Sequence, residues 1–190
     1  MRLSRGVARL ILLVLGWRVE GVAPPINKYV LIAAPHTSNW DLLFMLAAGA
    51  QLGIRTAWMG KHTLFRWPLG ALLRALGGIP VDRTGPNEAV GQIAAAMLHA
   101  QRMVIAIPPE GTRKRSEYWK SGFYHIAQSA QVPIVLTYLD YGRKCAGIGP
   151  ALDSRLPAKV LMAKAREFYQ TITPKYPDRF GPVRLRQEEI

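Results

Sequence analysis

One histidine and one carboxylate, five positions apart, are the residues of this chain best suited to chemistry. His36 and Asp41 lie between a β-prone apolar run at 29–32 and an apolar run with helical character at 42–52. A carboxylate that binds one ring N–H of an imidazole fixes its tautomer, and the other ring nitrogen can then act as a general base. Taken alone, the pair is better explained as a surface histidine beside an aspartate that suits a helix N-terminus. The base is therefore a hypothesis that needs support from elsewhere in the chain.

A second polar segment, residues 109–115, follows the buried apolar run at 103–107. Gly111 lets the backbone approach a ligand closely, and Arg113 can bind a phosphate through two parallel hydrogen bonds. Glu110 can fix Arg113 or the loop through an ion pair. A solvated charged turn is the alternative interpretation of this segment.

The charge of the chain favours anionic partners. There are 25 Lys and Arg residues against 12 Asp and Glu, a formal net charge of +13, which fits nucleic acid, anionic lipid or phosphorylated substrates. Lys61 and Arg83 could join Arg113 in an anion pocket, although Arg83 could instead pair with its neighbour Asp82. Cys145 is the single cysteine, so no intrachain disulfide can form and a reducing compartment fits.

Strands and helices are expected to alternate along the chain. Apolar runs predict strands at 17–22, 29–34, 55–59, 77–83, 103–107, 132–139 and 144–148. Helical spacing and capping residues predict helices at 39–53, 87–101, 123–130 and 157–170, and at 61–76 apart from Pro68 and Gly70. This alternation indicates one layered α/β domain with a largely parallel central sheet flanked by helices. The polar segments that follow the strands would then meet at one edge of the sheet.

The N-terminal segment combines arginines with an apolar run. Arg2, Arg5 and Arg9 precede the run at 10–15, which is well short of the ~20 residues needed to span a bilayer. A basic face, an apolar face and Trp17 suit a helix that lies among lipid headgroups. The alternative is a helix docked on the protein's own core.

Four short blocks occur in a fixed order along the chain. They are a His-x-x-x-x-Asp block at 36–41, a Gly-x-Ile-x-x-x-Arg block at 77–83, Pro-Glu-Gly-Thr-Arg at 109–113 and Val-Pro-Ile-Val at 132–135. Together they resemble the glycerolipid acyltransferase family, the 1-acylglycerol-3-phosphate acyltransferases and their relatives, over residues 17–156. Pro35 and Pro108 depart from the family pattern, which often has Asn and Phe there. These departures could reshape the acceptor pocket.

The resemblance implies a membrane-associated O-acyltransferase of phospholipid biosynthesis. His36 would deprotonate the free hydroxyl of a lysophospholipid, most simply 1-acylglycerol-3-phosphate, and Asp41 would orient His36. The alkoxide would attack the thioester of acyl-CoA or acyl-carrier protein, to give phosphatidic acid. The acceptor phosphate would be held by Lys61, Arg83, Glu110, Gly111, Thr112 and Arg113. No metal is implied, and no cofactor beyond the acyl thioester as co-substrate.

The chain is thus expected to have three parts and to be located at a membrane. They are an amphipathic membrane-associating helix at 1–16, the acyltransferase domain at 17–173 and a peripheral basic tail at 174–190. The basic surface would hold the protein at the cytoplasmic face of the cell membrane as a peripheral or monotopic protein. Two alternatives remain open: the same chemistry on another acceptor, such as lyso-ornithine lipid, or a non-catalytic basic module that binds nucleic acid. Against the second, no nucleic-acid motif is present and the aromatics are not interleaved with basic residues.

Overall fold

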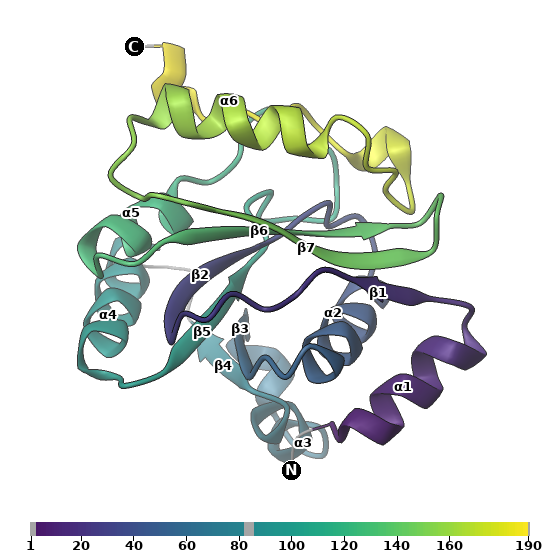
Figure 1. The fold of residues 1–190 in the computed structure, drawn as a ribbon. Coiled ribbons are helices and arrows are strands. Elements are labelled where there is room, and N and C mark those ends of the chain that lie inside the picture. The colour runs from purple at the N-terminus through teal and green to yellow at the C-terminus, as the bar shows by residue number, and fades with distance from the viewer. Residues whose placement is uncertain (1–2, 82–85, 190) are drawn as a thin grey trace.

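A single seven-stranded sheet organises the chain. The structure, a computed structural model, describes residues 3–81 and 86–189 (Figure 1). The strands are β1 (Arg18–Glu20), β2 (Lys28–Ala33), β3 (Thr56–Lys61), β4 (Gly78–Val81), β5 (Met103–Ile107), β6 (Ile134–Asp140) and β7 (Cys145–Leu152). The helices are α1 (Arg5–Val14), α2 (Trp40–Gln51), α3 (Gly70–Ala75), α4 (Pro86–His99), α5 (Gly122–Ser129) and α6 (Ala158–Tyr169). Short 3₁₀ turns are η1 (His62–Phe65), η2 (Pro177–Arg179) and η3 (Arg186–Glu189).

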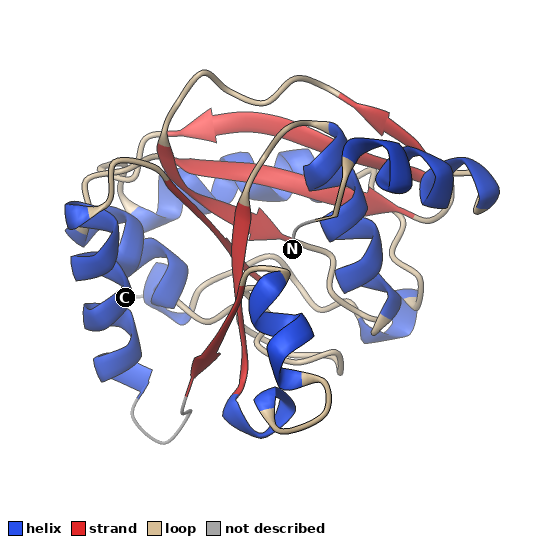
Figure 2. Cartoon of the chain, turned by 90° about the horizontal axis from the view of Figure 1, so that it is seen from below, coloured by secondary structure: helices blue, strands red, loops and turns tan. Residues whose placement is uncertain are grey.

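The sheet is largely parallel, as predicted from the alternation of strands and helices. Its strand order is β1-β7-β6-β2-β5-β3-β4, and the run from β6 to β4 is parallel throughout. β7 is antiparallel to β6 because a short turn joins the two strands, whereas a parallel pair needs a longer crossover. β1 pairs in parallel with β7 at the edge. Figure 2 shows how strongly the sheet twists between its two ends.

Both faces of the sheet are covered, which explains why its strands read as continuous apolar runs. Val30 and Ile32 of β2 point into a core that includes side chains of α4, α5 and α6. Tyr29 and Leu31 point to the opposite face, toward Trp58 and partly buried side chains of α2. This alternation follows from the two-residue period of a strand. In Figure 1, α6 lies on one side of β6 and β7, while α1 and α2 lie on the other.

The predicted helix at 61–76 is wrong over most of its length. Lys61 ends β3, η1 follows, and α3 begins only at Gly70. Pro68 has no N–H to donate and restricts the residue before it, so it interrupts a helix even where the apolar spacing is helical. A Cβ at Gly70 would overlap the carbonyl of Phe65. The apolar side chains of this segment therefore do not share one helix face.

The N-terminal helix α1 docks on the domain through one of its faces. The Ser4 hydroxyl accepts a hydrogen bond from the Val7 N–H and caps the helix. Ala8 and Leu12 are buried against a cluster that includes Phe44 of α2. The opposite face leaves apolar side chains in solvent, namely Val7, Leu10, Leu13 and Val14. Contact of this face with a membrane stays a prediction. No helix in the described part of the chain is long and apolar enough to cross a bilayer.

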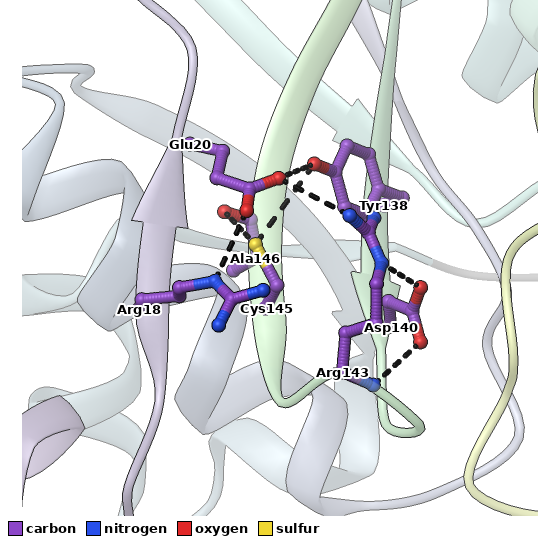
Figure 3. Close-up of polar contacts among 7 residues, drawn as sticks. All are labelled: Arg18, Glu20, Tyr138, Asp140, Arg143, Cys145 and Ala146. Carbon is purple, nitrogen blue, oxygen red and sulfur yellow. Dashed lines mark hydrogen bonds and ion pairs between the residues drawn. The ribbon is translucent and has the colours of Figure 1, made fainter.

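A polar network fastens β1, and with it α1, to the β6–β7 hairpin (Figure 3). The Tyr138 hydroxyl donates to Glu20 Oε2 at 2.7 Å, and Arg18 Nε donates to Glu20 Oε1 at 3.1 Å. The hydrogen bond from Tyr138 is the main reason that the pKa of Glu20 falls to about 2. Cys145 lies buried beside this network, and burial raises the pKa of its thiol. A thiol in this state is a poor nucleophile.

The C-terminal segment packs along the domain. Val183 and Leu185 are buried, and the backbone of Leu185 pairs with that of Trp119 in an isolated parallel β-bridge. The Tyr176 N–H donates to Thr37 Oγ1 at 3.3 Å. The segment predicted as a peripheral basic tail therefore contributes to the core and touches the loop that carries His36.

Gly77, which opens the second sequence block, has a structural reason to be glycine. Its φ is 89°, and a Cβ would overlap the Thr56 carbonyl oxygen of the neighbouring strand. We expect Gly77→Ala to lower the free energy of unfolding by about 1–3 kcal/mol, measured by urea denaturation.

Gly91→Ala is the matched control for this substitution. Gly91 lies on an exposed position of α4 with open space around it. Alanine there should leave the stability unchanged or raise it by up to about 1 kcal/mol. Equal stabilities of the two variants would contradict the interpretation of Gly77.

Candidate active site

The structure brings His36 and Asp41 together. His36 lies in the loop between β2 and α2, and Asp41 lies in the first turn of α2. His36 Nδ1 is 3.2 Å from Asp41 Oδ2, which also accepts the Ser38 N–H at 2.9 Å. Asp41 is buried, whereas His36 is partly exposed and lines a cavity. With Nδ1 held by Asp41, Nε2 is the nitrogen free to take a proton.

Tyr141, which the sequence analysis missed, completes the surroundings of Asp41. Its hydroxyl donates to Asp41 Oδ1 at 2.6 Å. Burial, and then the hydrogen bond to Asp41, raise the pKa of Tyr141 well above its usual value. The ring packs edge-on against Trp17 and Phe44. Because Tyr141 is 100 residues from Asp41, no local pattern could have revealed this contact.

Glu110 holds the backbone of the His36 loop. Its Oε1 accepts the His36 N–H at 2.9 Å, across the neighbouring strands β2 and β5. Its Oε2 is buried and has no hydrogen-bond partner among the described residues. Burial raises the pKa of Glu110 to about 7. The expected ion pair with Arg113 does not form, and Glu110 does not line the cavity. The structure thus places Glu110 behind the site rather than in contact with an acceptor phosphate.

A cavity of about 1230 Å³ extends from His36 between the sheet and its helices. The surface is largely apolar and comes from β2, α2, β3, α4, β5, α5, β6 and β7. Representative apolar residues are Leu31, Leu42, Met45, Ile54, Trp58 and Ile93. The volume exceeds the usual 300–1,000 Å³ of a small-molecule pocket. A cavity of this size and polarity suits a ligand with a long apolar chain.

Several cations line the same cavity as the histidine. Lys61 comes from the end of β3, and Gly111, Thr112 and Arg113 come from the loop after β5. Lys120, which the sequence analysis did not single out, joins them. These three cationic side chains are exposed and have no ion pair with any described acidic residue.

Gly111 has a conformational role in this loop. Its φ is 67°, and a Cβ would lie 3.1 Å from Lys120 Cγ. Glycine therefore permits both the turn and the close approach of Lys120. Arg83, the remaining predicted phosphate ligand, lies outside the described residues.

The arrangement fits one kind of chemistry. A histidine held by a buried carboxylate can remove a proton from a hydroxyl, an apolar cavity can hold a chain, and unpaired cations can bind an anionic group. Among the described residues no cluster of His, Cys, Asp and Glu could hold a metal ion. Fold and site together give an α/β domain in which a histidine held by a carboxylate faces an apolar cavity lined by cations.

Comparison with known proteins identifies the family. Residues 18–138 match the Acyltransferase family, and the chain belongs to it. The 1-acyl-sn-glycerol-3-phosphate acyltransferase of Escherichia coli (strain K12) is 34% identical over 108 residues, which cover 54% of this chain and 43% of that protein. The enzyme of the same name from Haemophilus influenzae is 30% identical over 129 residues, which cover 63% and 52% of the two chains. The chain spans about half the length of these relatives.

A solved structure shares the fold. The 1-acyl-sn-glycerophosphate acyltransferase from Thermotoga maritima superimposes with a TM-score of 0.60 at 18% identity, over 86% of this chain and 74% of that one. This likeness confirms the α/β architecture with its mostly parallel sheet.

The buried carboxyl of Glu110 should make stability depend on pH. Because its pKa is about 7 when folded and about 4.5 when unfolded, the folded state keeps a proton that the unfolded state loses between these values. The resulting stabilisation is complete below pH 4.5 and is lost as the pH rises through 7, a change of about 3 kcal/mol. In Glu110→Gln, which cannot titrate, this decline should be absent from urea denaturation curves.

Glu117→Gln is the control, because Glu117 is an exposed carboxylate paired with Arg184. The free energy of unfolding of Glu117→Gln should decline between about pH 4.5 and 7 as it does in the parent protein. An equal decline in Glu110→Gln would show that Glu110 is not the group responsible.

Proposed function

We propose that this protein transfers a fatty acyl group from an acyl thioester to the free hydroxyl of a lysophospholipid, most simply 1-acyl-sn-glycerol-3-phosphate. The observation that carries the proposal is that the His36–Asp41 pair opens onto a long apolar cavity bordered by Lys61 and Arg113. The names of the relatives support the acceptor and the reaction type. The product would be phosphatidic acid.

The reaction needs one base and no covalent intermediate with the protein. His36 Nε2 takes the proton of the acceptor hydroxyl, while Asp41 stabilises the imidazolium through Nδ1–H. The acceptor oxygen attacks the thioester carbonyl and forms a C–O bond. The tetrahedral intermediate then expels the thiolate, which takes the proton back from His36. Burial of Cys145 agrees with this direct transfer, because no thiol faces His36 as an alternative nucleophile in the described part of the chain.

The cations at the cavity suit the phosphate of the acceptor. Arg113 can bind two phosphate oxygens at once, and Lys61 and Lys120, which line the same cavity, add positive charge. The Thr112 hydroxyl lies in the same loop and can donate a further hydrogen bond. The Glu110 carboxyl contributes indirectly, because it fixes the backbone that carries His36.

The lipid acceptor favours work at a membrane. The exposed apolar face of α1 and the net charge of +13 suit peripheral attachment to anionic lipid at the cytoplasmic face of the cell membrane. Acyl-CoA and acyl-carrier protein both supply the required thioester. Family membership and the apolar cavity argue against the alternative of a nucleic-acid-binding module.

Replacement of the base tests the mechanism. We expect His36→Ala to reduce acyl transfer to 1-acyl-sn-glycerol-3-phosphate by roughly 10²–10⁴-fold, since general base catalysis is lost. Transfer is measured by mass spectrometry of the lipid product. His99→Ala, at the exposed end of α4, should retain full activity. Full activity in His36→Ala with an unchanged melting temperature would refute the assignment.

Removal of the phosphate ligand tests the acceptor. We expect Arg113→Ala to raise KM for phosphate-bearing lysolipids by roughly 10–100-fold, the loss of a charge-assisted hydrogen bond, with a smaller effect on kcat. For a lysolipid without a phosphate, such as lyso-ornithine lipid, Arg113→Ala should change KM little.

Lys114→Ala is the control for this series, because Lys114 is exposed and does not line the cavity. Equal losses on both kinds of acceptor would contradict phosphate binding by Arg113. A parent protein that prefers the phosphate-free acceptor would favour that acceptor as the physiological one.

A further inference from the structure

The segment after β3 carries an unusual number of apolar side chains in solvent. Leu64, Trp67, Leu69 and Leu72 are 55%, 93%, 58% and 46% exposed, respectively. They lie within nine consecutive positions that span η1, the turn at Pro68 and the start of α3. We call residues 64–72 the apolar loop. Scattered single apolar residues are normal on a protein surface, but a cluster of this size marks a contact with a partner.

The surroundings of the apolar loop are positively charged. Arg66 lies within the loop and is exposed, and Arg74 follows it and stacks on Phe65. In the whole stretch from residue 1 to residue 81 there are nine Lys and Arg residues but only two acids. Both acids are already engaged, since Glu20 belongs to the β1 network and Asp41 is buried beside His36. A partner with a negative surface fits this part of the molecule.

The apolar loop is close to α1 and to the active site. A small cavity is lined by Leu3 and Arg5 at the N-terminal end of α1 and by Leu76 just after α3. In Figure 1, α1 and α3 lie along the same lower edge of the molecule. Leu64 is exposed and also lines the large cavity that contains His36. The apolar loop therefore borders an opening of that cavity.

We propose that the apolar loop is a second membrane contact, which acts together with α1 to seat the opening of the cavity on an anionic bilayer. Tryptophan, leucine and arginine are the side chains that bind at the boundary between headgroups and acyl chains. With α1 and the apolar loop both in the bilayer, Leu64 at the cavity gives a lysolipid a path from the membrane to His36. The inference rests on the proposed function, but binding to vesicles is measured without any reaction.

The decisive variant is Trp67→Ser/Leu69→Ser, because both side chains are more than half exposed and neither lines the cavity. We expect its partition onto phosphatidylglycerol vesicles, measured by cosedimentation, to be roughly 10–100-fold weaker than that of the parent protein. Activity on a short-chain lysolipid that is monomeric in solution should be unchanged. The parent protein should bind these vesicles more tightly than phosphatidylcholine vesicles, and the difference should shrink in high salt.

Two further variants are controls for the loss of vesicle binding. Leu98→Ser/Val160→Ser removes exposed apolar side chains of α4 and α6, outside both α1 and the apolar loop, and should bind vesicles like the parent. Trp67→Phe keeps an aromatic ring and should retain most of the binding. All variants should melt within a few degrees of the parent, since no buried contact is removed.

Three outcomes would overturn the proposal. The first is that the double variant in the apolar loop binds anionic vesicles as tightly as the parent. The second is equal affinity of the parent for neutral and anionic vesicles. The third is that the parent self-associates in sedimentation, and that the variant abolishes this association while its affinity for vesicles is unchanged. The loop would then be a contact between two copies. If the parent protein transfers no acyl group to the monomeric lysolipid, the proposed function is refuted. The proposal about vesicle binding is not affected by that result.

Discussion

The Asp41 carboxylate is the constraint on which the candidate site depends. It is buried at the start of α2 and accepts hydrogen bonds from the Ser38 N–H and the Tyr141 hydroxyl, while His36 Nδ1 lies within reach. A buried carboxylate without such partners would be costly. The three groups come from one loop and from the end of a strand 100 residues away, so the position of His36 depends on the assembly of the whole sheet.

The parallel pairing of β2 with its neighbours brings the other parts of the site together. β5 lies on one side of β2 and β6 on the other, so the segments after all three strands meet at one edge. From β5 comes Glu110, which holds the His36 backbone, and beyond it Arg113 at the cavity. From β6 comes Tyr141. The site therefore needs few residues with special conformations beyond Gly111.

Local patterns in the sequence predicted most of the helices and strands, and they failed where the outcome depends on contacts distant in sequence. The apolar runs predicted each described strand of the sheet. The resemblance carried by the four ordered blocks, rather than the spacing of His36 and Asp41 alone, predicted that Asp41 orients His36. The helix expected at 61–76 failed because Pro68 overrides apolar spacing. The direction of the Glu110 side chain could not be foreseen, since a charged residue in a polar loop more often faces solvent.

The hydrogen bond from the Tyr176 N–H to Thr37 Oγ1 has a consequence for biosynthesis. Thr37 follows His36 in the chain, but its hydrogen-bond partner Tyr176 is made 139 residues later. Lys175 likewise lies over the rings of Trp40 and Tyr141. A nascent chain emerging from the ribosome can pair its first parallel strands long before these contacts exist. The loop that carries His36 therefore reaches its final contacts only after residues 175 and 176 have been synthesised and have folded back onto the domain.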